Sequence, residues 1–239
     1  MSIELDQKII VIAGGSTGIG LELARQAVQA GAQVQLLGRS AEKLALAQAA
    51  LGPQITTHCA DIGVEAEVEA LARAIPHVDH VVTTAAALTF KPFMNTSDAE
   101  INEMLGSKFW GPLYLVRHLV PRMPKGGSIT FYSGLAAYKA NPGASIVAAV
   151  NAALDGLART LAVELAPIRV NVVSPGVVDS PTWDFLPPET REGALGSIGD
   201  ALPVGRVGSV RELADAGLFL MGNGFATGTV LQVDGGANA

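Results

Sequence analysis

The 239-residue sequence predicts a three-layer α/β fold, in which helices cover both faces of a doubly wound parallel sheet. Three observations support this prediction. Short β-rich runs alternate with longer amphipathic runs along almost the whole chain. Hydrophobic residues make up 49% of the sequence, as a sheet buried on both faces requires, and 27 glycines suit tight connections. No internal repeat or low-complexity linker divides the chain, so residues 1–239 are predicted to form a single domain.

The predicted strands are short runs bounded by turn-forming residues. They cover residues 8–14, 33–38, 55–61, 78–86, 127–133, 168–176 and 229–236. The helices between them have capping residues where the pattern is clearest, with Ser40 as an N-cap and Gly52 directly after a helix end. Predicted helices cover residues 18–32, 40–52, 64–75, one long segment ending near Pro121 or Pro124, residues 144–164 and residues 211–221. This alternation favours parallel strands joined by right-handed crossovers.

Residues 180–208 lack clean periodicity and are predicted to leave the layered body without forming a second domain. Their apolar residues Trp183, Phe185 and Leu186 either contact a mainly uncharged substrate or pack against the body.

Composition excludes several functions. The net charge of −6 and the lack of a Lys/Arg cluster argue against nucleic-acid binding. The N-terminus lacks an apolar targeting core, and no run of about 18 uncharged apolar residues occurs, so we expect a cytoplasmic protein without a membrane span. The single cysteine, Cys59, is expected to be a small buried residue. The histidines have no metal-ligand spacing, so no metal site is predicted; they are His58, His77, His80 and His118.

A glycine-rich turn follows the first predicted strand. Gly14, Gly18 and Gly20 have the spacing G-x-x-x-G-x-G, and a predicted helix starts directly after them. Such glycines let backbone N–H groups approach a pyrophosphate at the positive end of a helix, although a tight turn without a ligand remains the alternative. The residues expected at this site are Gly14, Ser16, Thr17, Gly18, Ile19 and Gly20.

The end of the second predicted strand indicates which dinucleotide binds. An acidic residue there accepts hydrogen bonds from a ribose and repels a 2′-phosphate, but this chain has Gly38 followed by Arg39. Because a guanidinium pairs well with phosphate, NADP(H) is favoured over NAD(H). The alternative for Arg39 is a solvated surface side chain.

Together these motifs resemble the short-chain dehydrogenase/reductase family along essentially the whole chain. The resemblance is carried by GGSTGIG (14–20), Asp61, AVELAPIRVNVVSPG (162–176), PVGRVG (203–208) and TGTVLQVDGG (227–236). It implies a Rossmann-like oxidoreductase, often a homodimer or homotetramer, with residues 180–208 as its substrate lid. It places further cofactor contacts at Asp61, Ile62, Thr84, Ala85, Pro175, Gly176, Val178 and Ser180. Asp61 would contact the adenine, or instead only cap the strand end, and Val178 and Ser180 would approach the nicotinamide amide.

The resemblance fails at the family's reactive residues. The family uses a serine, a Tyr-x-x-x-Lys pair and an asparagine, but no such pair occurs here. Ser133 keeps the serine position, whereas Val147 stands at the tyrosine position and Asn151 at the lysine position. Lys108 aligns with the asparagine, so lysine and asparagine have exchanged places.

Two functions follow from this exchange. In the first, the chain reduces a carbonyl or a related C=N or C=C bond: Ser133 orients the substrate, and Lys108 binds or protonates it, since burial can bring an ammonium pKa into a useful range. Lys108 is otherwise a solvated or interface lysine, Asn151 is a structural hydrogen-bonding group, and Tyr138 and Lys139 are alternative substitutes for the missing pair. In the second, the chain is a catalytically silent dinucleotide sensor or partner subunit, because Val147 cannot donate a proton.

Overall fold

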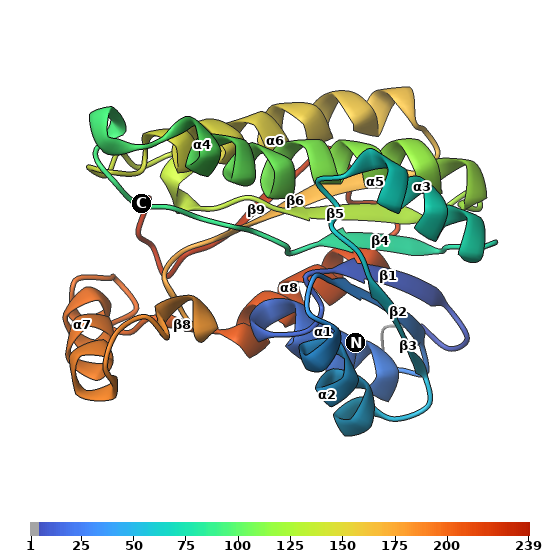
Figure 1. Cartoon of the computed structure of the whole chain (residues 1–239), viewed down its shortest axis with the longest axis horizontal. Coiled ribbons are helices and arrows are strands. Elements are labelled where there is room, and N and C mark those ends of the chain that lie inside the picture. The colour runs from blue at the N-terminus through green and yellow to red at the C-terminus, as the bar shows by residue number, and fades with distance from the viewer. Residues whose placement is uncertain (1–4) are drawn as a thin grey trace.

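The computed structural model describes residues 5–239, and these contain a parallel sheet of seven strands in the order β3-β2-β1-β4-β5-β6-β9 (Figure 1). The strands are β1 Ile9–Ala13, β2 Gln33–Gly38, β3 Ile55–Cys59, β4 His80–Thr83, β5 Ser128–Tyr132, β6 Arg169–Pro175 and β9 Val230–Val233. The order reverses between β1 and β4, so the connections run first to one side and then to the other. The predicted doubly wound parallel sheet is therefore confirmed.

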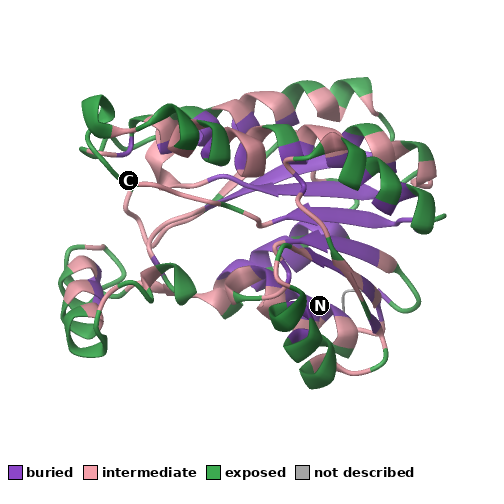
Figure 2. Cartoon of the chain, viewed as in Figure 1, coloured by how far each residue is buried: buried purple, intermediate pink, exposed green. Residues whose placement is uncertain are grey.

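Helices cover both faces of this sheet (Figure 1). One face packs against α1 Gly18–Gln29, α2 Ala41–Leu51 and α8 Val210–Gly222, and the other against α3 Glu65–Ala74, α5 Gly111–Leu119 and α6 Ser145–Glu164. Successive side chains of β1 enter different cores: Ile10 and Ile12 join the first, and Val11 and Ala13 the second. The central strands are buried on both faces, as Figure 2 shows.

The long helix predicted before Pro121 is interrupted. It consists of α4, Asp98–Leu105, a π-helical turn, Gly106–Trp110, and then α5, which is followed by a short 3-10 turn, Val120–Arg122. A π-helical turn holds more residues than an α-helical turn and is typical of functional sites. Its middle residue, Lys108, is only 6% exposed, so this turn aims a charged side chain into the protein.

The segment predicted to leave the body contains more regular structure than its sequence indicates. A short strand, β7 Val178–Asp179, pairs with β8 Gly208–Ser209, and helix α7, Pro188–Asp200, lies between them. In Figure 1 this helix stands apart at the lower left of the layered body. Only Leu195 and Gly199 of α7 are buried, which explains why its sequence shows no apolar periodicity.

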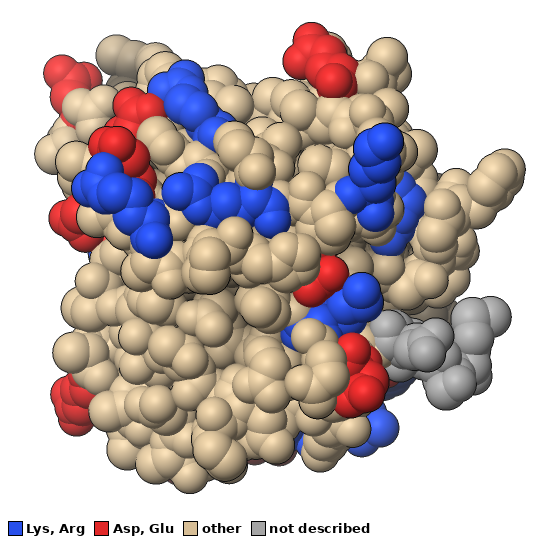
Figure 3. Space-filling model, turned by 90° about the vertical axis from the view of Figure 1, so that its right-hand side faces the viewer, with Lys and Arg blue, Asp and Glu red and all other residues tan. Residues whose placement is uncertain are grey.

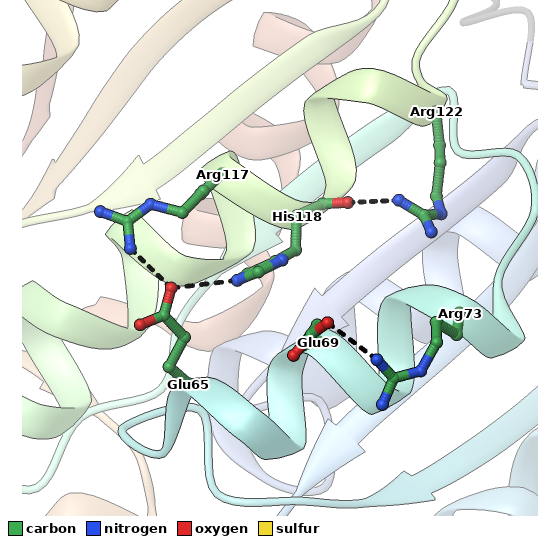
Figure 4. A network of polar contacts seen from close by, with 6 residues as sticks. All are labelled: Glu65, Glu69, Arg73, Arg117, His118 and Arg122. Atoms are coloured by element: carbon green, nitrogen blue, oxygen red, sulfur yellow. Dashed lines mark hydrogen bonds and ion pairs between the residues drawn. The ribbon is translucent and has the colours of Figure 1, made fainter.

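An ion-pair network joins α3 to α5 on the outer surface (Figure 4). Glu65 of α3 accepts hydrogen bonds from Arg117, at 2.5 Å, and from His118, at 3.1 Å. The Arg117 hydrogen bond is the largest effect that lowers the pKa of Glu65. On the face seen in Figure 3, acidic and basic groups are interspersed in a largely uncharged surface.

Within residues 5–239, α6 alone is long and apolar enough to cross a membrane by length and composition. It carries Asp155 and Arg159, and its inner face packs on the sheet as part of the second core.

Candidate active site at the carboxyl edge of the sheet

The glycine-rich turn lies between β1 and α1, where the neighbouring backbone leaves no room for side chains. Gly14 has φ +83°, and a Cβ atom there would lie 2.5 Å from the backbone nitrogen of Ala85. A Cβ atom on Gly20 would lie 2.3 Å from the carbonyl oxygen of Gly14. Within the described chain, Thr17 at the N-cap of α1 makes no side-chain capping bond. The first N–H groups of α1 therefore remain available to an anion.

This turn opens onto a cleft of about 670 Å³, within the size range of small-molecule and cofactor sites. Its lining contains twelve of the predicted cofactor residues: Gly14, Ser16, Thr17, Gly18, Ile19, Gly20, Arg39, Asp61, Ile62, Thr84, Ala85 and Ser180. Pro175, Gly176 and Val178 stand outside the lining, and Gly176 instead lies against the backbone of Asp234. The donors and the volume of this cleft fit a dinucleotide.

Several polar residues that line the cleft were not predicted from the sequence. Ser40, Lys43, Ser107 and Thr182 also line it. The N-cap pattern at Ser40 was the available signal for the first two, since a helix N-terminus beside Arg39 attracts phosphate. Ser107 could not be found in this way, because it reaches the cleft through the π-helical turn.

Arg39 lies at the rim of the cleft and forms an ion pair with Glu103 of α4, with 3.2 Å between Nη1 and Oε1. It is therefore an exposed, paired side chain that also lines the cleft. The carbonyl oxygen of Arg39 lies 3.5 Å from the sulfur of Cys59. The expected burial of Cys59 is wrong, because it ends β3, the edge strand of the sheet, and is exposed.

Two residues of the cleft hold its backbone in place. Asp61 accepts a hydrogen bond of 2.8 Å from the backbone N–H of Gly63, which is the strand-end role considered from the sequence. The hydroxyl of Thr84 lies 3.1 Å from the carbonyl oxygen of Ala13 and 3.2 Å from that of Gly14, and so ties β4 to the glycine-rich turn. Both residues also line the cleft, so these structural roles are compatible with the predicted cofactor contacts.

Three of the four predicted reactive positions form one buried cluster. The ammonium of Lys108 donates hydrogen bonds to the backbone oxygen of Ser133, at 2.7 Å, and to Oδ1 of Asn151, at 2.5 Å. The interpretation of Lys108 as a solvated lysine is therefore wrong. Burial lowers the pKa of Lys108 to about 8, and the negative charge of Asp155 opposes that shift. The Ser133 hydroxyl is buried and has no hydrogen-bond partner among residues 5–239.

Val147, the fourth predicted position, packs in an apolar group with Met104 and Ala144. The three tyrosine hydroxyls lie elsewhere. Tyr132 donates to the backbone oxygen of Leu213, Tyr138 donates to Asp155, and the Tyr114 ring stacks on Trp110. No tyrosine of the described chain lines the cleft. Lys139, considered with Tyr138 as a substitute, donates to the backbone oxygen of Ala237 instead.

Two aromatic residues of the predicted lid follow the cleft residue Thr182; Trp183 is partly buried and Phe185 is exposed. Trp183 and Phe185 stack with ring centroids 6.2 Å apart, and 74% of Phe185 is accessible to solvent. Arg191 of α7 donates to Asp179, at 2.5 Å, and to the backbone oxygen of Ser180, at 3.1 Å, and so holds α7 to the edge of the cleft. Across residues 5–239 no three His, Cys, Asp or Glu side chains are grouped to hold a metal ion.

Comparison with known proteins gives consistent matches over the whole chain. A family model described as enoyl-(acyl carrier protein) reductase matches residues 13–238. Carbonyl reductase family member 4 of Xenopus laevis is 30% identical over 237 residues, covering 96% of this chain and 97% of the relative. The 3-oxoacyl-[acyl-carrier-protein] reductase FabG of Chlamydia trachomatis is 30% identical over 251 residues, covering 99% of each chain.

Solved structures agree with these matches. A small-chain dehydrogenase in complex with NADPH is 31% identical, with a TM-score of 0.85 over 98% of this chain and 99% of that one. The MalC reductase/Diels-Alderase of Malbranchea aurantiaca is 29% identical, with a TM-score of 0.89 over 98% of this chain and 97% of that one.

Proposed function

The chain belongs to the short-chain dehydrogenase/reductase family of oxidoreductases, and from that premise we propose that it is an NADP(H)-dependent reductase with an atypical active site. Its substrate is a small, mainly apolar molecule with a carbonyl or a related C=N or C=C bond. Ser133 orients the reacting group, and Lys108 supplies positive charge and a proton. The observation that carries the proposal is the buried Lys108 ammonium, hydrogen-bonded at Ser133 and Asn151.

The cofactor supplies the hydride, and the chain supplies the electrostatic environment in which the substrate accepts it. Reduction of a carbonyl builds negative charge on oxygen, which a nearby ammonium and a hydroxyl donor stabilise. Lys108 uses two of its three N–H donors for Ser133 and Asn151, and the Ser133 hydroxyl is free to donate. A lysine pKa of about 8 lies close to the range in which a group both holds and releases a proton at neutral pH.

The positive charge of the Lys108 cluster favours some substrates over others. A preformed iminium is positively charged, so a nearby ammonium repels it and weakens its binding. A ketone, aldehyde or conjugated carbonyl develops negative charge and benefits from the same ammonium. We therefore expect carbonyl compounds to be reduced with a higher kcat/KM than iminium ions. The stacked aromatic rings of Trp183 and Phe185, which follow the cleft residue Thr182, favour an apolar substituent on the substrate.

Preference for NADP(H) rests on the rim of the cleft. Arg39 and Lys43 provide two positive charges, and Ser16 and Ser40 provide hydroxyl donors within the same lining. These groups can form charge-assisted hydrogen bonds with a 2′-phosphate. No acidic residue stands at the end of β2, where it would bind the ribose hydroxyls of NAD(H). The solved relative that contains NADPH supports this assignment by similarity. Association into a homodimer or homotetramer is part of the same proposal.

The decisive test measures NADPH oxidation with ketones, aldehydes, enones and imines, using the wild type and Lys108→Met. We expect turnover of at least one carbonyl substrate, and a loss of activity in Lys108→Met without a loss of NADPH binding. Unchanged activity in Lys108→Met would exclude the role of this lysine.

The silent dinucleotide sensor remains the second candidate function, favoured by the apolar packing of Val147 at the position of the family's tyrosine. NADPH binding by calorimetric titration, without turnover of any compound in the panel, would favour it. One robust substrate would exclude it.

A further inference from the structure

A second ionisable side chain, Asp155, is buried next to the cluster of Lys108, Ser133 and Asn151. Asp155 lies four residues after Asn151 on α6, so the two share one face of the helix. Only 4% of Asp155 is exposed. Its Oδ2 atom accepts a hydrogen bond of 2.5 Å from the hydroxyl of Tyr138, and its Oδ1 atom has no partner within residues 5–239.

The direct partners of Lys108 do not neutralise its charge, because both are uncharged oxygens. A buried ammonium without a counterion is costly. Within residues 5–239, Asp155 is a buried carboxylate one helical turn from Asn151, the partner of Lys108, and its negative charge raises the pKa of Lys108. Four charged or titratable groups on the adjacent helices α4 and α5 have other partners, and Asp98 of α4 is exposed. These pairs are Glu100 with Lys91, Glu103 with Arg39, and Arg117 and His118 with Glu65.

Tyr138 belongs to the connection between β5 and α6, the same connection that begins with Ser133. It follows the 3-10 turn Leu135–Ala137. Burial raises the pKa of Tyr138 to about 12, and the hydrogen bond to Asp155 acts in the same direction, while the charge of Arg159 opposes it. The phenol therefore stays protonated and donates to Asp155 throughout the neutral range.

We propose that Asp155 is the buried counterion of Lys108 and that the hydroxyl of Tyr138 fixes its carboxylate. The two residues form a positioning pair that acts on the substrate only through Lys108, so its catalytic consequence rests on the proposed function. The structural claim, a charge interaction between Asp155 and Lys108, stands independently of turnover.

The test is the pH dependence of folding stability, which requires no substrate. The unfolded chain holds the Lys108 proton up to a pKa of 10.5, whereas the folded chain releases it near 8, so the Lys108 contribution to stability rises with pH across that window. Subtracting the unfolding free energy of Lys108→Met from that of the wild type, by urea unfolding at each pH, isolates this contribution. In the Asp155→Asn background we expect this rise in stability to begin about one pH unit or more lower, because the pKa of Lys108 falls further without the carboxylate.

Two further variants separate a charge interaction from a packing effect. Tyr138→Phe keeps the carboxylate and removes its hydrogen bond, so it is expected to shift the window in the same direction by less. Glu164→Gln removes an exposed carboxylate at the end of α6 and is expected to leave the window unchanged. If Asp155→Asn folds poorly, Tyr138→Phe still provides the measurement.

An unchanged window in Asp155→Asn, or in Tyr138→Phe if Asp155→Asn does not fold, would overturn the inference, even if Lys108 proves essential for activity. A shifted window in a protein without turnover would support the inference and count against the proposed function instead. With a substrate available, kcat should fall with rising pH at a lower pH in Asp155→Asn than in the wild type, because the acid form of Lys108 is lost earlier.

Discussion

Arg39 and Glu103 form an ion pair of 3.2 Å that links the rim of the cofactor cleft to helix α4. More than half of each side chain is exposed, so the pair contributes little to stability. Its importance lies in the competition that it implies. A 2′-phosphate that binds Arg39 must displace the carboxylate of Glu103 or approach it closely, and either event lowers the affinity for NADP(H).

Glu103→Gln is therefore expected to strengthen the binding of NADPH by up to about fivefold, the size of an exposed ion pair. Binding of NADH should change much less, since it carries no 2′-phosphate. Fluorescence titration with both cofactors measures the two effects. Glu69→Gln, which breaks the exposed pair with Arg73 away from the cleft, provides the matched control. Equal strengthening for both cofactors would argue against this competition.

Ser133→Ala tests the free hydroxyl of the buried cluster. The serine hydroxyl is buried and has no hydrogen-bond partner in residues 5–239, so its loss should affect the reacting substrate rather than the fold. We expect kcat to fall by about 10² to 10³, as for the removal of one donor to a developing oxyanion. The dissociation constant of NADPH should stay the same. Steady-state kinetics on the best substrate of the panel measures kcat. A loss of NADPH binding would point to a structural role for Ser133 instead.

Gly20→Ala tests the close approach of α1 to the glycine-rich turn. The new methyl group would meet the Gly14 carbonyl oxygen at 2.3 Å and the Thr84 hydroxyl at 2.5 Å, so we expect a loss of about 1–3 kcal/mol in unfolding free energy. Gly156→Ala is the matched control in α6. Its Cβ atom would come no closer than 3.8 Å to the guanidinium of Arg159, so this substitution should stabilise by about 0.5–1 kcal/mol. Urea unfolding compares the two, and equal effects would contradict the steric argument.

His80 makes the folded state sensitive to acid. It is buried in β4, its Nδ1 atom lies 2.8 Å from the hydroxyl of Ser128, and burial lowers its pKa from 6.5 to about 4. Between pH 6.5 and about 4, His80 is protonated in the unfolded chain but stays neutral in the folded chain. Stability therefore decreases between pH 6.5 and about 4, by about 3 kcal/mol in all.

His80→Gln is expected to lose that part of the acid sensitivity, as measured by urea unfolding at several pH values. His77→Gln alters a half-exposed histidine beside Asp79 and should leave most of the dependence in place. An acid sensitivity equal to that of the wild type in His80→Gln would contradict the assignment.

The sequence alone determined the order and type of most elements, and it predicted twelve residues that line one cleft. These features depend on local patterns: apolar runs of strand length, a glycine spacing before a helix, and Ser133 at the end of a strand. The carboxyl ends of parallel strands must meet at one edge, so residues that follow different strands could be expected at one cleft without knowledge of the contacts.

The tertiary structure decided what each polar side chain contacts. The π-helical turn turns Lys108 inward, and nothing in its sequence distinguishes it from an ordinary helix with a solvated lysine. Arg39 pairs with Glu103, and Tyr138 with Asp155, across different elements. The exposure of Cys59 likewise depends on the place of its strand at the edge of the sheet. Side-chain partners and burial depend on how whole elements pack in space, and a local pattern of residues carries no record of that packing.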